Sequence, residues 1–219
     1  MRIYFHLSPN RELVPFNYQQ YLVGAFHKWL GENSLHDEVS LYSLSWLSGG
    51  GVRGKGLDFP TGSTFFISAP SDDLLSDLIK GAMANHPIRW GMEVTNITIQ
   101  RTPDFGIKQR FMVQSPVLIK RKIDTAKQQE YYYPGDKESN TLLTETITTK
   151  LKRAGLNYQA EVSFDPNYKN PKTKKITYKN LDIKATYCPV IITGDPRAVQ
   201  FAWEVGVGSS TGIGFGALN

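Results

Sequence analysis

Hydrophobic periodicity in the order β-α-β-β-α-β over residues 1–101, repeated loosely after residue 110, predicts an α+β fold of two tandem ferredoxin-like (RRM-like) domains. The first half shows the order clearly, with turn residues between its strand and helix patterns. The second half follows the same plan without an exact sequence repeat, so its assignment rests on element order alone. We therefore predict an N-terminal domain over residues 1–110 and a C-terminal domain over residues 111–219.

The first domain is defined by two helix starts and four strand patterns. Asn17, with Gln20 at the third helical position, forms a capping-box pattern that predicts a helix with an apolar face from Tyr18 to Leu30. Ser71 precedes Asp72 and Asp73, which predicts a second helix that ends before Pro87. Strands are expected at Arg2–Ser8, Val39–Leu47, Ser63–Ala69 and Ile88–Arg101.

The second domain is predicted from similar signals. A helix is expected at about 140–154, ending at Gly155, and another begins at Asp195-Pro196 and runs to about Val205. Strands are expected at 111–123, 158–164 and 176–188, with a hairpin tip rich in Pro, Asn and Lys before the third, and a short final strand at 213–215. Ser115-Pro116 indicates a bulge or an edge in the first of these strands.

The composition indicates a globular protein of 219 residues with 40% hydrophobic and 21% charged residues. The single cysteine, Cys188, excludes an internal disulfide and a cysteine-based metal cluster. The N-terminal residues lack a signal-peptide pattern, and no apolar run reaches the roughly 18 residues that span a bilayer. We expect a soluble, cytoplasmic protein that does not contact membranes.

Positive charge is concentrated in the second half of the chain. Residues 1–110 carry ten Lys/Arg and ten Asp/Glu, whereas residues 111–219 carry fifteen and ten, which places the whole net charge of +5 there. The basic residues lie among Tyr168, Tyr178 and Tyr187, a mixture suited to nucleic-acid backbone and unstacked bases. The alternative is a solvated strand face and hairpin tip. The basic clusters are Lys120, Arg121 and Lys122, and Lys169, Lys172, Lys174, Lys175, Lys179 and Lys184.

The C-terminal segment contains five glycines in eleven residues: Gly206, Gly208, Gly212, Gly214 and Gly216. Glycine permits positive φ and close approach of the backbone to another group. The segment follows a predicted helix, so it is a candidate cradle for phosphates, formed by backbone amides. Its spacing matches neither GxGxxG nor GxxxxGK[ST], which argues against a nucleotide P-loop. A glycine-rich hairpin or linker is the alternative.

Four landmarks in the sequence follow one another in a recognisable order. They are Asn17–Leu22, Leu35–Glu38 followed by Leu41–Ser45, Val113–Val117, and a C-terminal segment of the form GxGxxxxxGFG. The set spans nearly the whole chain. Together these landmarks resemble, in the same order, segments of the CRISPR-associated endoribonucleases of the RAMP superfamily, which cut CRISPR repeat RNA into guide RNAs.

The resemblance implies RNA cleavage without metal, in which the RNA's own 2′-OH attacks the phosphate and leaves 2′,3′-cyclic phosphate and 5′-OH ends. It places the family's catalytic histidine at His36, and places His27 at a helix position often held by tyrosine. Histidine suits both proton transfers near neutral pH. The sequence itself offers two further histidines, His6 in a strand and His86 before Pro87, which we expect to be structural or surface residues.

The residue that stabilises the phosphate is not defined by the sequence. A lysine often found after the family's loop histidine has no counterpart here, and Ser40 lies nearby instead. Arg53 and Lys55 could supply the charge, and Tyr21 is a weaker candidate because it falls on the apolar face of its helix.

We therefore expect a metal-independent endoribonuclease with no cofactor that binds CRISPR repeat RNA. The expected RNA-binding residues are Lys120, Arg121, Lys122, Lys174, Lys175 and the five glycines. One alternative is a repeat-RNA-binding protein with little or no turnover, and another is a small-molecule sensor built on paired ferredoxin-like domains. Steep salt dependence distinguishes RNA binding from the sensor. The sequence leaves open a homodimer and membership of a complex with other CRISPR effector proteins.

Overall fold

The structure is a computed structural model that describes residues 1–31, 39–122 and 129–219. The first half contains β1 (Arg2–Leu7), α1 (Gln19–Leu30), β2 (Ser43–Leu44), β3 (Gly51–Arg53), β4 (Gly56–Asp58), β5 (Ser63–Ser68), α2 (Asp72–Ala84) and β6 (Val94–Gln100). The second half contains β7 (Lys108–Phe111), β8 (Lys120–Lys122), β9 (Gln129–Tyr131), α3 (Ser139–Arg153), β10 (Ala160–Phe164), β11 (Lys172–Tyr178), β12 (Leu181–Tyr187), β13 (Val190–Gly194), α4 (Pro196–Val205) and the 3-10 turn η1 (Thr211–Ile213).

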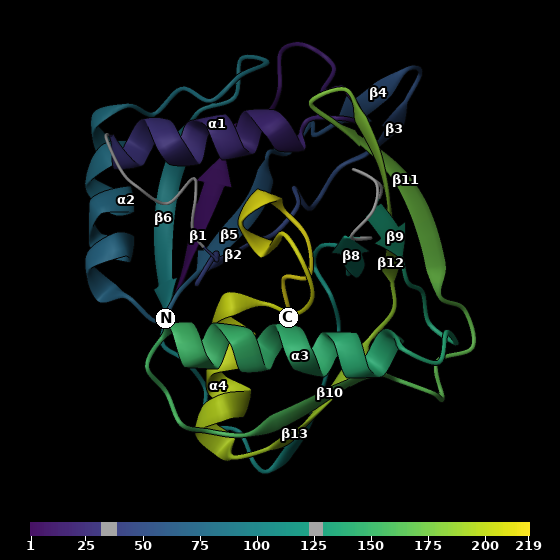
Figure 1. Ribbon diagram of the computed structural model, residues 1–219. Coiled ribbons are helices and arrows are strands. Elements are labelled where there is room, and N and C mark those ends of the chain that lie inside the picture. The colour runs from purple at the N-terminus through teal and green to yellow at the C-terminus, as the bar shows by residue number, and fades with distance from the viewer. Residues whose placement is uncertain (32–38, 123–128) are drawn as a thin grey trace.

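The first half forms an antiparallel sheet in the order β2-β5-β1-β6, which is the ferredoxin-like strand order. α1 and α2 pack against each other beside this sheet, and the β3–β4 hairpin is inserted between β2 and β5 (Figure 1). The stacked rings of Phe5, Trp29 and Phe65 join β1, α1 and β5 in one core. The ferredoxin-like prediction is therefore confirmed in the first half.

The second half repeats the plan with a much shorter fourth strand. Its sheet has the order β10-β13-β7, and a bridge between Val113 and Leu218 places the C-terminal segment next to the continuation of β7. α3 and α4 pack against each other, α3 against β10 and α4 against β13. The expected final strand at 213–215 is wrong, because the left-handed backbone of Ser210 (φ 62°) and Gly214 (φ 91°) turns the chain there.

β11 and β12 form a separate two-stranded hairpin (Figure 1). Its turn is Lys179-Asn180, and both residues have positive φ, at 46° and 66°. This is the backbone of the tight two-residue turns that join antiparallel strands. The predicted tip in the Pro/Asn/Lys-rich segment is therefore wrong, since that segment leads into β11 and the turn follows later.

Two of the predicted helix caps are confirmed, whereas a third cap and one strand differ from the prediction. Ser71 accepts a hydrogen bond from the Leu74 amide (3.2 Å), as predicted for an N-cap. Asp195 caps α4 in the same way. Asn17 does not cap α1, whose N-cap is Tyr18, without a side-chain bond. The long strand expected from 111 is broken into β7 and β8, with Pro116, which has no N–H to donate, between them.

The two halves are joined by a buried arginine at the start of the chain. Arg2 is 1% exposed, and its guanidinium lies 3.7 Å from the ring centroids of both Phe66 on β5 and Trp203 on α4. It also donates hydrogen bonds of 2.6 Å to Ser68 Oγ and to the Leu218 carbonyl. This contact fixes the C-terminal segment against the first sheet and brings η1 next to β2.

Candidate functional site

The glycine-rich segment, residues 206–216, is called the glycine loop below. It leaves the C-terminal end of α4 and is mostly buried. The amides of Gly206, Gly214 and Gly216 donate hydrogen bonds to the carbonyls of Ala202, Thr211 and Pro116, at 2.9, 3.3 and 2.9 Å. These three N–H groups are therefore engaged within the chain, and the phosphate cradle formed by this segment stays a prediction.

Close packing explains most of the glycines. Gly216 has φ +62°, and a Cβ at this position would overlap the Val207 carbonyl. A Cβ on Gly208 would lie 2.5 Å from the Leu118 carbonyl, and one on Gly212 would lie 2.5 Å from Ser40 Oγ. The loop is thus a packed structural element that holds its neighbours at short range, and a flexible linker does not describe it.

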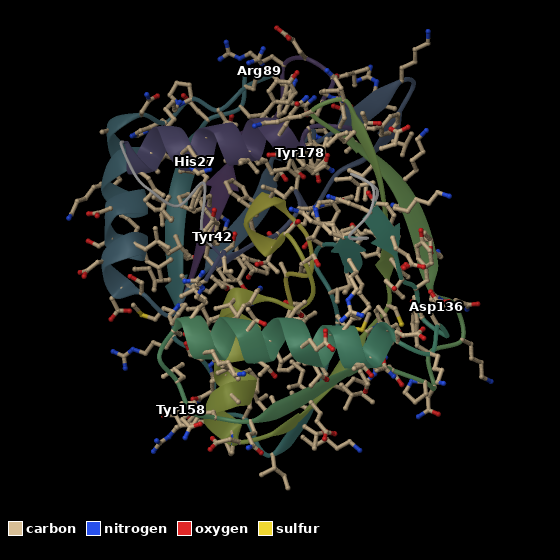
Figure 2. The ribbon with its side chains drawn as sticks, viewed as in Figure 1. His27, Tyr42, Arg89, Asp136, Tyr158 and Tyr178 are labelled. Atoms are coloured by element: carbon tan, nitrogen blue, oxygen red, sulfur yellow. The ribbon has the colours of Figure 1, made fainter. Side chains whose placement is uncertain are left out.

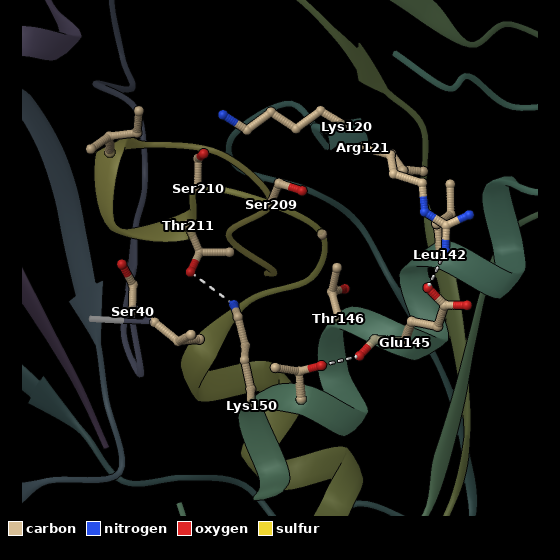
Figure 3. A pocket seen from close by; sticks show the side chains of 15 residues that line it. Ser40, Lys120, Arg121, Leu142, Glu145, Thr146, Lys150, Ser209, Ser210 and Thr211 are labelled. Atoms are coloured by element: carbon tan, nitrogen blue, oxygen red, sulfur yellow. Dashed lines mark hydrogen bonds and ion pairs between the residues drawn. The ribbon is translucent and has the colours of Figure 1, made fainter. Parts of the chain in front are cut away.

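A pocket of about 500 Å³ opens between the glycine loop, α3 and β8 (Figure 3). It brings together Ser40, Lys120, Arg121 and Gly208, four of the residues singled out from the sequence. Its other lining residues are Val39, Ile119, Leu142, Glu145, Thr146, Thr149, Lys150, Ser209, Ser210, Thr211 and Ile213. The pocket therefore combines cationic side chains with several hydroxyl groups.

The two cations that β8 contributes to this pocket differ in their surroundings. Lys120 is partly buried, and burial together with the nearby positive charge of Lys122 lowers its pKa. Arg121 is more exposed and pairs with Glu145 on α3 at 3.2 Å. An anion in the pocket would relieve the repulsion between Lys120 and Lys122. The pocket therefore favours a negatively charged ligand.

Lys150 is the residue of this pocket that sequence reasoning missed. It is 4% exposed, and its Nζ donates to the carbonyls of Val205 (2.8 Å) and Gly206 (3.2 Å) and to Thr211 Oγ1 (2.9 Å). Burial lowers the pKa of Lys150 to about 7. The available signal was its spacing, because Lys150 falls on the buried face of α3 with Leu143 and Ile147.

A chain of contacts leads from Lys150 to α1. The Thr211 hydroxyl donates to the Tyr42 carbonyl at 2.8 Å, and the Tyr42 ring stacks on Phe26 with a centroid distance of 4.6 Å. Burial raises the pKa of Tyr42 to about 12, with a hydrogen bond to Ser40 acting in the opposite direction. His27 meets Phe26 edge-on at 5.0 Å and lies on α1 above Tyr42 (Figure 2).

The structure therefore places His27, Ser40 and the glycine loop in one neighbourhood, since α1 also packs against η1. His27 is half-buried. His36, the residue expected to be catalytic, lies outside the described residues. His6 makes hydrogen bonds to threonines of the first sheet, and His86 bonds to the Met83 carbonyl at the end of α2, which matches the structural roles expected for both.

Three predicted phosphate-stabilising residues do not reach the pocket. The Tyr21 ring packs edge-on against Trp90 at 5.4 Å and lies under the Arg89 guanidinium, because it belongs to the apolar face of α1. Arg53 pairs with Asp58 at 2.9 Å on the β3–β4 hairpin. Lys55 lies in the turn of the same hairpin. This hairpin lies away from the glycine loop (Figure 1). The structure gives none of the three a place among the residues that line the pocket.

The β11–β12 hairpin, which carries Lys174 and Lys175, also lies apart from this pocket. Lys174 Nζ is 5.2 Å from the ring centroid of Tyr187, and Lys175 pairs with Asp182 at 2.7 Å. Both lysines line a second groove, of about 650 Å³, between β11 and the first half of the chain. They therefore lie on a strand that borders a groove, with an aromatic ring beside Lys174. Lys122 is exposed on β8.

Comparison with known proteins agrees with the sequence resemblance. Residues 100–219 match the family model for CRISPR associated protein Cas6, C-terminal. The CRISPR-associated endoribonuclease Cas6 1 of Methanocaldococcus jannaschii is 22% identical over 240 residues, which cover 100% of this chain and 92% of the relative.

Solved structures show the same fold. The product of a Cas6-related gene from Pyrococcus furiosus superposes with a TM-score of 0.88 at 18% identity, covering 100% of this chain and 97% of the other. A RAMP protein described as binding different RNA substrates gives 0.86 at 18% identity, covering 100% and 98%. These neighbours share the tandem ferredoxin-like architecture. Separately, no helix in residues 1–31, 39–122 and 129–219 has the length and apolar character needed to cross a membrane.

Proposed function

Because the chain belongs to the Cas6 family of CRISPR-associated proteins, we propose that it cuts CRISPR repeat RNA into guide RNA by attack of the RNA's own 2′-OH, without a metal ion. Family membership supports an RNA endonuclease. The finer proposal is that the products carry a 2′,3′-cyclic phosphate and a 5′-OH, because the 2′-oxygen forms the new bond to phosphorus as the 5′-oxygen leaves.

One observation carries this proposal: the pocket beside the glycine loop gathers Ser40, Lys120 and Arg121 next to the helix that bears His27. Cations and hydroxyl donors in a partly buried site stabilise the charge that develops on a reacting phosphate. Lys120 is the candidate for the role of the family's missing lysine, because it lines the same pocket as Ser40.

Two histidines suit the proton transfers of this reaction. We assign His36 and His27 as a base and an acid, without deciding which is which. A base removes the proton of the 2′-OH, and an acid protonates the departing 5′-oxygen. The His27 ring contacts the Phe26 ring, which stacks on Tyr42. The Thr211 hydroxyl donates a hydrogen bond to the Tyr42 carbonyl. This connects His27 to the wall of the pocket.

Ser40 favours a second candidate function, a repeat-RNA-binding protein with weak cleavage. A serine hydroxyl carries no charge and stabilises a reacting phosphate less than a lysine in its place would. In this alternative the pocket and the second groove hold RNA, but turnover is slow. The rate measured under single-turnover conditions separates the two candidates.

Incubation of end-labelled repeat RNA with the protein in EDTA tests the proposal. We expect one main cut, with a 2′,3′-cyclic phosphate on the upstream fragment and a 5′-OH on the downstream fragment. An RNA of equal length without the repeat sequence serves as the control and should remain intact. Cleavage that appears only when a divalent cation is added would reject the metal-independent mechanism.

A further inference from the structure

We propose that Lys150, in its charged form, is a positioning residue that acts through Thr211 to hold the Ser40–Tyr42 segment of the first half against the glycine loop of the second half. The inference rests on the proposed function for its effect on RNA cleavage. The contacts themselves do not depend on that function, so they are tested separately below.

Lys150 is held by groups that accept hydrogen bonds and carry no net charge. Two of them, the carbonyls of Val205 and Gly206, lie at the C-terminal end of α4, where the helix dipole favours a cation. The third is Thr211 Oγ1 at the start of η1 (Figure 3). The ammonium group of Lys150 thus links α3 to the glycine loop at two places, Gly206 and Thr211.

Other charged groups around Lys150 are already engaged elsewhere or belong to the pocket wall. On α3, Glu145 pairs with Arg121 of β8. Lys120 of β8 lines the same pocket. At the end of α4, Glu204 binds the Thr102 hydroxyl and the N-terminal amine. The Tyr42 hydroxyl of the first half bonds to Ser40.

Counting donors shows why the charge of Lys150 matters. An ammonium group has three N–H donors, which match its three acceptors, and the Thr211 proton is then free to bond the Tyr42 carbonyl. A neutral amine has two N–H donors and one lone pair. The two carbonyls of Val205 and Gly206 can only accept, so Thr211 would turn its proton toward the amine. The Tyr42 carbonyl would then lose its donor.

The pH dependence of this link has a definite sign. The pKa of Lys150 is lowered from 10.5 to about 7 in the folded protein, so the ammonium form and the Thr211–Tyr42 bond are present below that value. Above it the link is lost. For stability, the desolvation penalty is complete below pH 7 and vanishes above pH 10.5, where both states are neutral. Burial of Lys150 thus opposes folding near neutral pH, which is expected if the residue serves positioning.

The test replaces Thr211 with valine, which keeps the shape and removes the hydroxyl, and with serine, which restores it. The control is Thr148→Val on α3, whose hydroxyl bonds the carbonyl of Thr144 in its own helix. We expect Thr211→Val to lower single-turnover cleavage roughly 10- to 100-fold through misplacement of the site. Thr211→Ser and Thr148→Val should stay within about threefold of the wild type on the same scale.

The ratio of wild-type to Thr211→Val cleavage is measured against pH, so that pH effects common to both proteins cancel. The ratio should fall toward one above pH 7. Hydrogen exchange of residues 209–214 provides a readout without RNA. Exchange in this segment should be faster in Thr211→Val, and in the wild type it should accelerate above pH 7 beyond the intrinsic rate.

The outcomes separate the inference from the proposed function. Equal cleavage and equal exchange in Thr211→Val and the wild type would overturn the inference and leave the function standing. If the wild type does not cut repeat RNA, the function fails, and the exchange data alone decide the inference. If Thr211→Val does not fold, the wild-type exchange profile against pH decides it, and a profile without a step near pH 7 rejects it.

Discussion

Replacement of His36 by alanine is expected to lower single-turnover cleavage of repeat RNA by at least ~10²-fold, since one positioned proton-transfer group contributes typically ~10²–10⁴ in rate. RNA affinity should stay within a few-fold, because a proton-transfer group acts mainly in the transition state and contributes little to ground-state binding. Cleavage is measured with enzyme in excess over labelled RNA, and affinity is measured by filter binding with an RNA that cannot be cut.

His27 and His86 complete this experiment. His27→Ala should lose as much activity as His36→Ala if His27 is the partner acid or base, and less if it only orients the RNA. His86→Ala is the matched control, because this exposed histidine bonds the Met83 carbonyl at the end of α2 and does not line the pocket. Full activity in His36→Ala, with the protein folded and binding RNA, would exclude His36 from the reaction.

Replacement of Gly216 by alanine should destabilise the protein by about 3 kcal/mol or more. Its φ of +62° carries a penalty for any residue with a Cβ, and that Cβ would overlap the Val207 carbonyl. The Gly216 amide also bonds the Pro116 carbonyl, so the backbone cannot shift freely. For a chain of this size, we expect the Tm to fall by at least ~6 °C.

Gly106→Ala is the control for this measurement. Gly106 is exposed, and a Cβ built there meets no atom within 4 Å. Its Tm should stay within about 2 °C of the wild type, as for most surface substitutions. Equal Tm values for the two variants would show that the glycine loop tolerates side chains and that its glycines serve another purpose.

Much of the fold could be predicted because local signals determine it. Ser71 and Asp195 mark helix starts through their own side-chain bonds, and the apolar periodicity of α1, α2 and α3 is set by one buried face each. The errors occur where distant contacts decide. The fourth strand of the second half is a single bridge at Leu218, fixed by the buried guanidinium of Arg2 from the other end of the chain.

The site was predicted less completely than the fold. Ser40 converges on one pocket with Lys120 and Arg121 of β8, although it lies far from them in the sequence. The glycines were assigned to phosphate binding, but three of their amides bond within the chain, because nothing in a glycine's identity distinguishes close packing from ligand contact. Lys150 has no motif, and its role depends on the carbonyls at the end of a helix about 55 residues away.

The most direct test of the central claim uses repeat RNA with a single 2′-deoxy nucleotide just upstream of the cut, assayed in EDTA. If the 2′-OH is the nucleophile, its removal should abolish cleavage at that bond while the Kd for the RNA changes by no more than a few-fold. A 2′-deoxy nucleotide placed one position downstream is the control and should leave the cut intact. Cleavage of the upstream-substituted RNA at the same bond would contradict the 2′-OH mechanism and both histidine assignments with it.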